Sequence, residues 1–256
     1  MYGEDGNRRT ALIVGIALAA LLIVGAAAFF LTRSGPTTPA DIEALFERSP
    51  VDRDTARALK ANYPADYQRM LDRIARVYRE QGRQAAIREG SVFVEQFLRS
   101  KANALVAAPD RELQRIGGAQ VALIHALRDE NVNLCADYAM RGLSPETRVS
   151  APTIALISRL GVVIVEAARA GDQPGRTPRP TLSDEDQRAW IAAMAAIDPV
   201  VARQIEGDGV GSATPAVQCH AGTVLYEAAQ RLPGQVSANV TAYLVRESMR
   251  PTAPAR

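Results

Sequence analysis

An uncharged apolar run near the start of the chain is the strongest constraint on the fold. Every residue from Ala11 to Leu31 is Ala, Leu, Ile, Val, Gly or Phe, which makes 21 consecutive residues without a charge. At about 1.5 Å of rise per residue, a helix of this length spans about 30 Å, the thickness of the hydrocarbon core of a bilayer. The run therefore predicts a transmembrane helix over residues 11–32, in contact with the lipid bilayer.

The basic residues around this run indicate its orientation. Arg8 and Arg9 precede it directly, whereas Arg33 is followed by no basic residue before Arg48. Because cytoplasmic flanks carry the excess of basic residues, we expect residues 1–10 in the cytoplasm and the rest of the chain outside.

Of the 30 basic residues 28 are arginine, a bias typical of a GC-rich bacterial genome. We therefore expect a single-pass protein of the inner membrane with a periplasmic C-terminal domain.

A cleaved signal peptide is the alternative to a membrane anchor. The sequence Ala26-Ala27-Ala28 would supply the small residues of a cleavage site. The apolar region of a signal peptide usually has about 7–15 residues, whereas this run continues past the alanines to Leu31. We prefer the uncleaved anchor and leave cleavage open as the second interpretation.

The remainder of the chain has the composition of a helical protein. The chain contains 45 alanines and only 5% aromatic residues, a mixture that favours helices over sheets. Helix-start signals recur along it, and strand-like alternation is almost absent. We therefore predict an all-α protein with a short stalk over 33–40, a bundle of about nine or ten helices over 41–250, and a flexible tail over 251–256.

Four segments give this bundle its expected internal order. The segment 65–81 carries one clear apolar stripe, and 84–107 is expected to form one continuous helix. A long helix over 144–170 has a nearly all-apolar centre, so we expect it to be a buried central helix and not a second membrane span. The Pro- and Gly-rich segment 171–182 is the candidate subdomain boundary.

Missing motifs exclude several classes of chemistry. Neither Lys60 nor Lys101 follows a glycine, so the chain lacks the Gly-Lys-Ser/Thr step of a phosphate-binding loop. It also lacks the GxSxG, HExxH, CxxC and EF-hand patterns, and its two histidines are too few for a three-histidine metal site. A net charge of only +2 argues against a dedicated nucleic-acid binder. We therefore predict no nucleotide, nucleic-acid, cofactor or metal site and assign no catalytic residue.

Two polar features keep an enzyme as the alternative. His125 and Asp129 are four residues apart on a predicted helix, so their side chains could meet as half of a metal or acid–base site. An ordinary pair on a helix surface is the competing interpretation. A cell-wall hydrolase could also act through a lone carboxylate. The pair Glu247-Ser248 matches the start of one such pattern, but the accompanying Gly-Leu-Met-Gln sequence is missing.

The two cysteines predict a disulfide bond. Cys135 and Cys219 are the only cysteines of the chain, and the expected periplasmic location is oxidising. A bridge between them would tie the middle of the domain to its C-terminal part. Two buried free thiols are the alternative.

A run of arginines gives two neighbouring predicted helices a basic surface. Nearby aspartates and glutamates offset this charge in part. The surface could meet anionic lipid headgroups or an acidic partner, and a solvated charged face is the simpler interpretation. The arginines are Arg69, Arg73, Arg76, Arg79, Arg83 and Arg88.

These features together favour a protein-interaction or scaffold module of the bacterial envelope. The anchor, the helical pattern and the missing catalytic motifs support this hypothesis. The alternative is an envelope enzyme, for example a cell-wall hydrolase that uses a lone carboxylate or the His125/Asp129 pair. An exposed apolar groove would favour the first function, and a deep pocket with convergent polar groups would favour the second.

Overall fold

The described part of the chain is entirely helical. It forms twelve α-helices and contains no strand. The predicted all-α class is therefore confirmed, whereas the predicted number of about nine or ten helices is too low. The computed structural model describes residues 38–144, 147–207 and 209–249.

Three predictions fall on residues outside the described part. The cytoplasmic segment 1–10, the transmembrane helix 11–32 and the tail 251–256 stay predictions from the sequence. Pro39 and Ala40, which lie at the end of the predicted stalk, are the first residues of helix α2, and the sequence Thr38-Pro39 itself predicts a helix start there.

The helices follow one another with short connections, apart from the segments before α9, α10 and α12. Their bounds are α2 (Pro39–Arg48), α3 (Arg53–Asn62), α4 (Pro64–Gln81), α5 (Arg83–Ser100), α6 (Ala102–Val106), α7 (Asp110–Glu130), α8 (Val132–Arg141), α9 (Ala151–Gly171), α10 (Asp184–Ile197), α11 (Pro199–Glu206), α12 (Pro215–Arg231) and α13 (Gly234–Ser248).

Local sequence signals explain where several helices begin. Thr38 and Asp41 form a capping box at α2, in which the Thr38 hydroxyl accepts a hydrogen bond from the Asp41 N–H at 3.2 Å and the Asp41 carboxylate accepts one from the Thr38 N–H at 2.9 Å. Ser183 accepts a hydrogen bond from the Asp186 N–H at the start of α10. Asp198 caps α11 in the same way, so these starts were accessible from sequence.

The helix predicted over 84–107 is broken at Lys101. Helix α5 ends one residue before Lys101, and α6 begins one residue after it. The Lys101 ammonium group donates a hydrogen bond to Asp172 at 2.8 Å and lies 4.4 Å from the ring centroid of Tyr63. Both partners are distant in the sequence, so the break depends on tertiary contacts that local helix propensity does not contain.

The helix predicted over 144–170 begins later than expected. Helix α9 starts at Ala151, and Ser150 is its N-terminal flanking residue. The carboxylate of Glu130, at the end of α7, accepts hydrogen bonds from the Ser150 N–H at 2.7 Å and from the Thr153 hydroxyl at 2.7 Å. A carboxylate from another helix therefore binds the start of α9. The predicted start at Ser144 was wrong.

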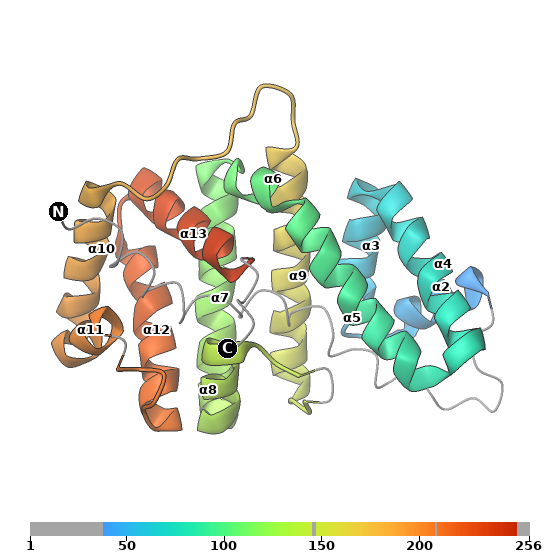
Figure 1. Cartoon of the computed structure of the whole chain (residues 1–256), viewed down its shortest axis with the longest axis horizontal. Helices are drawn as coiled ribbons and strands as arrows, with labels where there is room; N and C mark the ends of the chain where they lie inside the picture. The colour runs from blue at the N-terminus through green and yellow to red at the C-terminus, as the bar shows by residue number, and fades with distance from the viewer. Residues whose placement is uncertain (1–37, 145–146, 208, 250–256) are drawn as a thin grey trace, which may run out of the picture.

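The helices stand side by side in an elongated row (Figure 1). Helices α7 and α9 occupy the middle and pack against each other. Helix α12 packs on the α7–α8 side and leads to α10 and α11 at one end of the row. On the other side, α3 packs against α9 and leads to α2 and α4, while α5 crosses this region diagonally.

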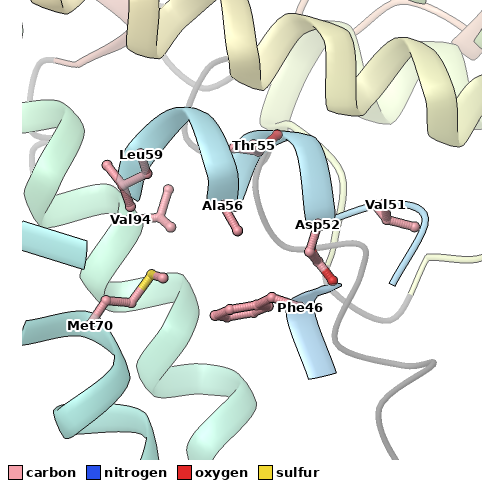
Figure 2. A pocket seen from close by; sticks show the side chains of 8 residues that line it. All are labelled: Phe46, Val51, Asp52, Thr55, Ala56, Leu59, Met70 and Val94. Carbon is pink, nitrogen blue, oxygen red and sulfur yellow. The ribbon is translucent and has the colours of Figure 1, made fainter. Parts of the chain in front are cut away.

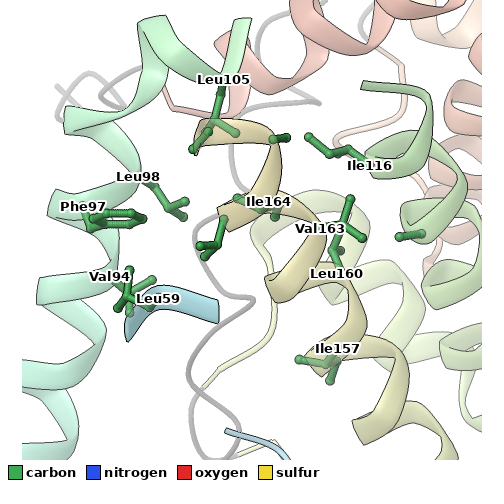
Figure 3. Close-up of a cluster of buried hydrophobic side chains, with 14 of the residues drawn as sticks. Leu59, Val94, Phe97, Leu98, Leu105, Ile116, Ile157, Leu160, Val163 and Ile164 are labelled. Atoms are coloured by element: carbon green, nitrogen blue, oxygen red, sulfur yellow. The ribbon is translucent and has the colours of Figure 1, made fainter. Parts of the chain in front are cut away.

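Helix α9 is the apolar centre of the row. It is the one helix among the described residues that is long and apolar enough to cross a membrane, judged by length and composition alone, and 56% of its most apolar window is buried in the fold. Leu160 and Ile164 are essentially inaccessible to solvent. Figure 3 shows Ile164 facing Leu98 of α5, and Val163 of the same helix on the side of Ile116 of α7. As the sequence predicted, α9 is a buried core helix.

The hydrophobic core continues past the candidate subdomain boundary at 171–182. One cluster of buried residues lies mainly in α2–α9, and a second lies mainly in α10–α13. The two clusters meet within α12, where Cys219 belongs to the first and Ala221 to the second. The boundary segment itself is tied down, because Arg179 pairs with Asp110 of α7 and donates a hydrogen bond to Asn239 of α13 at 2.8 Å.

The contact between α6 and α9 gives the first prediction. A Cβ atom at Gly171 would lie 1.8 Å from the backbone oxygen of Ala104, so the two helices must separate to accept any side chain. Gly171→Ala should therefore lower the free energy of unfolding by about 1–3 kcal/mol, which urea titration of the full chain in detergent would measure.

Gly118→Ala is the matched control for this prediction. Gly118 also lies within a helix, but the nearest atom to its added Cβ is Gln230 Oε1 at 3.8 Å, an ordinary contact. Helix propensity predicts that this variant is as stable as the wild type or more stable, by up to about 1 kcal/mol. Equal stability of Gly171→Ala and Gly118→Ala would contradict the close packing of α6 on α9.

Candidate functional site

The structure separates the two residues of the predicted His125/Asp129 pair. His125 Nε2 lies 2.7 Å from Glu227 Oε1 on α12, whereas Asp129 pairs with its neighbour Arg128. The histidine therefore links α7 to α12 instead of forming half of a site with Asp129. In residues 38–144, 147–207 and 209–249, no group of three or more His, Cys, Asp or Glu side chains could hold a metal ion.

The carboxylate suggested by Glu247-Ser248 is buried. Glu247 is only 2% exposed and lies on the buried side of α13. A catalytic carboxylate must reach its substrate, so this position does not match the role of a lone general acid. A different carboxylate, which the sequence did not single out, comes closer to that role.

Asp52 lies at an apolar pocket between α2, α3, α4 and α5 (Figure 2). The lining residues are apolar except for Asp52 and Thr55. The Ser49 hydroxyl donates a hydrogen bond to the Asp52 carboxylate at 2.7 Å. The pocket is lined by Phe46, Val51, Asp52, Thr55, Ala56, Leu59, Met70 and Val94.

The surroundings of Asp52 raise the pKa of its carboxyl group. Burial among apolar side chains raises the pKa of Asp52 to about 6 from its ordinary value of 3.8, and the hydrogen bond from Ser49 opposes this shift only in part. A carboxyl group with a raised pKa is suited to general acid chemistry. The cavity volume, however, is only about 50 Å³, enough for one or two water molecules and far below the roughly 300–1,000 Å³ of ligand sites.

A second, larger hollow lies between α7 and α9 and is also lined by Asp54 of α3. We call it the α7/α9 groove. Its volume is about 550 Å³, within the range of binding sites. Most of its lining side chains are small or apolar, and three charged residues accompany them. The lining residues are Asp54, Arg115, Gly118, Ala119, Ala122, Ala155, Arg159, Val162 and Val163.

The charged residues of the groove differ in their pairing. Arg115 donates hydrogen bonds to Glu112 at 2.5 Å and to Glu166 at 2.7 Å, so its charge is compensated within the fold. Asp54 pairs with the neighbouring Arg53 at 3.2 Å. Arg159 is exposed and has no hydrogen-bond or ion-pair partner in the described part of the chain. The rim therefore presents one uncompensated positive charge.

The structure brings the two predicted cysteines together. The sulfur atoms of Cys135 on α8 and Cys219 on α12 are at disulfide distance, 1.98 Å, and the Cα atoms are 5.1 Å apart. Both residues are buried. The pair joins helices that already pack closely, across 84 residues of sequence.

The arginine-rich surface of α4 and α5 is partly internal to the fold. Arg73 bridges the two helices, because it donates a hydrogen bond to Glu89 at 2.6 Å and lies 5.9 Å from the ring centroid of Phe93. Arg69 pairs with Asp66 on its own helix. At these positions the arginines are compensated within the fold, as on a structural helix surface.

Comparison with protein-family models, curated protein sequences and solved structures finds no match for this chain. The function must therefore be argued from the groove and the pocket themselves. Sequence reasoning missed both, because each combines residues from separate helices. The α7 side of the groove did leave a signal, since Gly118, Ala119 and Ala122 place short side chains on one helix stripe.

The raised pKa of Asp52 predicts a pH-dependent effect of Asp52→Asn. The folded state keeps the Asp52 proton up to about pH 6, whereas the unfolded chain loses it near the ordinary pKa of 3.8. The stability of the wild type should therefore fall as the pH rises through this range. Asparagine removes the charge and keeps an acceptor for Ser49, so the variant should gain on the order of 1–3 kcal/mol at about pH 8 and almost nothing at about pH 4.

Chemical denaturation of the two full-length proteins at both pH values measures this difference. Ser49→Ala provides a comparison, because it removes the hydroxyl donor and leaves the carboxylate in place. An equal gain for Asp52→Asn at both pH values would show that the carboxylate is not desolvated in the folded protein.

The proximity of Cys135 and Cys219 predicts one disulfide-linked peptide pair in a non-reducing peptide map of untreated protein. Closing a loop of about 85 residues should stabilise the fold by up to about 4–5 kcal/mol through the lost entropy of the unfolded chain. Reduction should therefore lower the melting temperature. Two thiols that react with an alkylating reagent after denaturation without reductant would contradict the bridge and argue for a reducing compartment.

Proposed function

We propose that this chain is a membrane-anchored interaction module of the bacterial envelope. Residues 11–32 would hold it in the inner membrane with the N-terminus in the cytoplasm, and the helical domain would bind another protein in the periplasm. The uncharged run Ala11–Leu31 and the preceding arginines support the anchor. Two cysteines at disulfide distance fit an oxidising compartment.

The observation that carries the interaction function is the α7/α9 groove. It has a volume of about 550 Å³, a lining in which six of nine residues are Gly, Ala or Val, and an arginine, Arg159, that has no partner among the described residues. Apolar surface on a folded protein is stabilised when a partner removes it from water. Among the described residues, the substantially exposed large apolar side chains are those of Val92, Val132 and Val200, which lie on three different helices outside the groove and form no common surface with it. The groove is therefore the best candidate for a binding surface.

The second candidate function is an envelope hydrolase, and Asp52 is the observation that favours it. A carboxyl group with a pKa of about 6 beside an apolar pocket could donate a proton to a leaving group. The volume of about 50 Å³ places this candidate second, because a polysaccharide or peptide substrate needs more room. Loss of cellular function in Asp52→Asn, without loss of the protein, would favour the enzyme.

Site-specific photocrosslinking in the membranes of the native host tests the interaction function. A photoreactive amino acid is placed in the full chain at three exposed alanines, Ala65 of α4, Ala155 of α9 and Ala192 of α10. We expect a discrete adduct with another protein from at least one position, identified by mass spectrometry. Adducts with lipid alone, or no adduct at any of the three positions, would contradict an interaction module.

A further inference from the structure

The α7/α9 groove has a shape into which one further helix can pack. Helices α7 and α9 run antiparallel, as the bond from Arg115 near the start of α7 to Glu166 near the end of α9 requires. The small residues that line it are Gly118, Ala119 and Ala122 of α7 and Ala155 of α9, and we call this set the groove floor. Because these side chains are short, a row of larger side chains from an incoming helix can enter between the two helices.

Gly118 is a feature of the groove that the fold itself does not require. At its neighbour Gly117, an added Cβ would lie 2.0 Å from Gln230 Nε2, so that side chain would have to move. At Gly118 the nearest atom to an added Cβ is 3.8 Å away, so alanine would fit. Glycine at an exposed position inside a helix costs about 1 kcal/mol relative to alanine. Packing within the described fold therefore leaves open space at Gly118.

The charge of the rim indicates what the incoming helix carries. Arg115 is compensated by Glu112 and Glu166, whereas Arg159 has no partner among the residues that the structure describes. A carboxylate is the chemical complement of an unpaired guanidinium group and can accept two hydrogen bonds from it. A lysine or arginine at the same place would be repelled.

We propose that the α7/α9 groove binds an amphipathic α-helix of a partner protein, with its apolar stripe on the groove floor and an Asp or Glu side chain on Arg159. This inference rests on the proposed interaction function and specifies its partner. A helix satisfies its own backbone hydrogen bonds, so it can lie on an apolar floor that offers no sheet edge. A second copy of this chain that met it symmetrically, groove to groove, would leave the hollow unfilled, at the cost of lost packing contacts.

Binding of two matched synthetic helical peptides to the full chain in lipid nanodiscs tests the proposal. Both peptides have about 18 residues, or five turns, with the same Leu/Ala stripe. One carries Glu and the other Lys at the position that faces Arg159. Fluorescence anisotropy should show that the Glu peptide binds wild type about tenfold more tightly than the Lys peptide. Arg159→Glu should reverse this preference, which a role of Arg159 in folding alone would not do.

Further variants locate the binding site on the groove. Ala155→Leu, which fills the floor, should weaken both peptides, whereas Ala192→Leu places the same side chain on exposed α10 and should change neither. Arg76→Glu reverses an exposed arginine of α4 outside the groove and should also leave the preference unchanged. Circular dichroism of each variant verifies that it is folded.

Several results would overturn the proposal. These are no binding of either peptide to wild type, a preference for Glu that survives Arg159→Glu, and binding that is insensitive to Ala155→Leu. A dimer in sedimentation that Ala155→Leu dissociates would assign the groove to a second copy. Photoadducts with another protein from Ala65 or Ala192 but not from Ala155 would leave the interaction function standing and remove only the groove as its site.

Discussion

The burial of α9 is the constraint on which the rest of the structure depends. This helix is apolar around most of its circumference, with Leu160, Val163 and Ile164 among its buried residues. A helix of this kind is stable in water only when neighbours cover it on several sides. Helices α3, α6 and α7 supply this cover, and all three precede α9 in the chain. The row in Figure 1 is the outcome of that requirement.

The same close packing explains why a groove exists. Helices approach each other closely only where side chains are short, as at Gly171 against Ala104 and at Gly222 against Ala139, where an added Cβ would lie 2.6 Å from the alanine Cβ. On the buried sides of α7 and α9 this proximity excludes water. On the solvent side, other small residues of α7 and α9, among them Gly118, Ala122 and Ala155, line a hollow. The α7/α9 groove is thus the exposed continuation of the core packing.

Most helices could be predicted from the sequence because their signals are local. The apolar stripe of α4 and the caps at Thr38, Ser183 and Asp198 each lie within a few residues of the helix that they define. The incorrect predictions, in contrast, concern helix boundaries that depend on residues distant in the sequence. The break at Lys101 depends on Asp172, and the start of α9 depends on a carboxylate at the end of α7. Contacts of this range are set by the tertiary fold, and periodicity carries no information about them.

The candidate sites were harder to predict because they too depend on contacts between distant residues. Their charged residues also distinguish the two proposed functions. The partner of His125 is Glu227, 102 residues away, so spacing along one helix pointed to Asp129 instead. Asp52, whose pKa is raised, lines a cavity of about 50 Å³ that only small molecules can enter. Arg159 is exposed to solvent and lines the α7/α9 groove, which has a volume of about 550 Å³. A macromolecular partner can reach and compensate the charge of Arg159 but not that of Asp52. For this reason we place the interaction function before the hydrolase function.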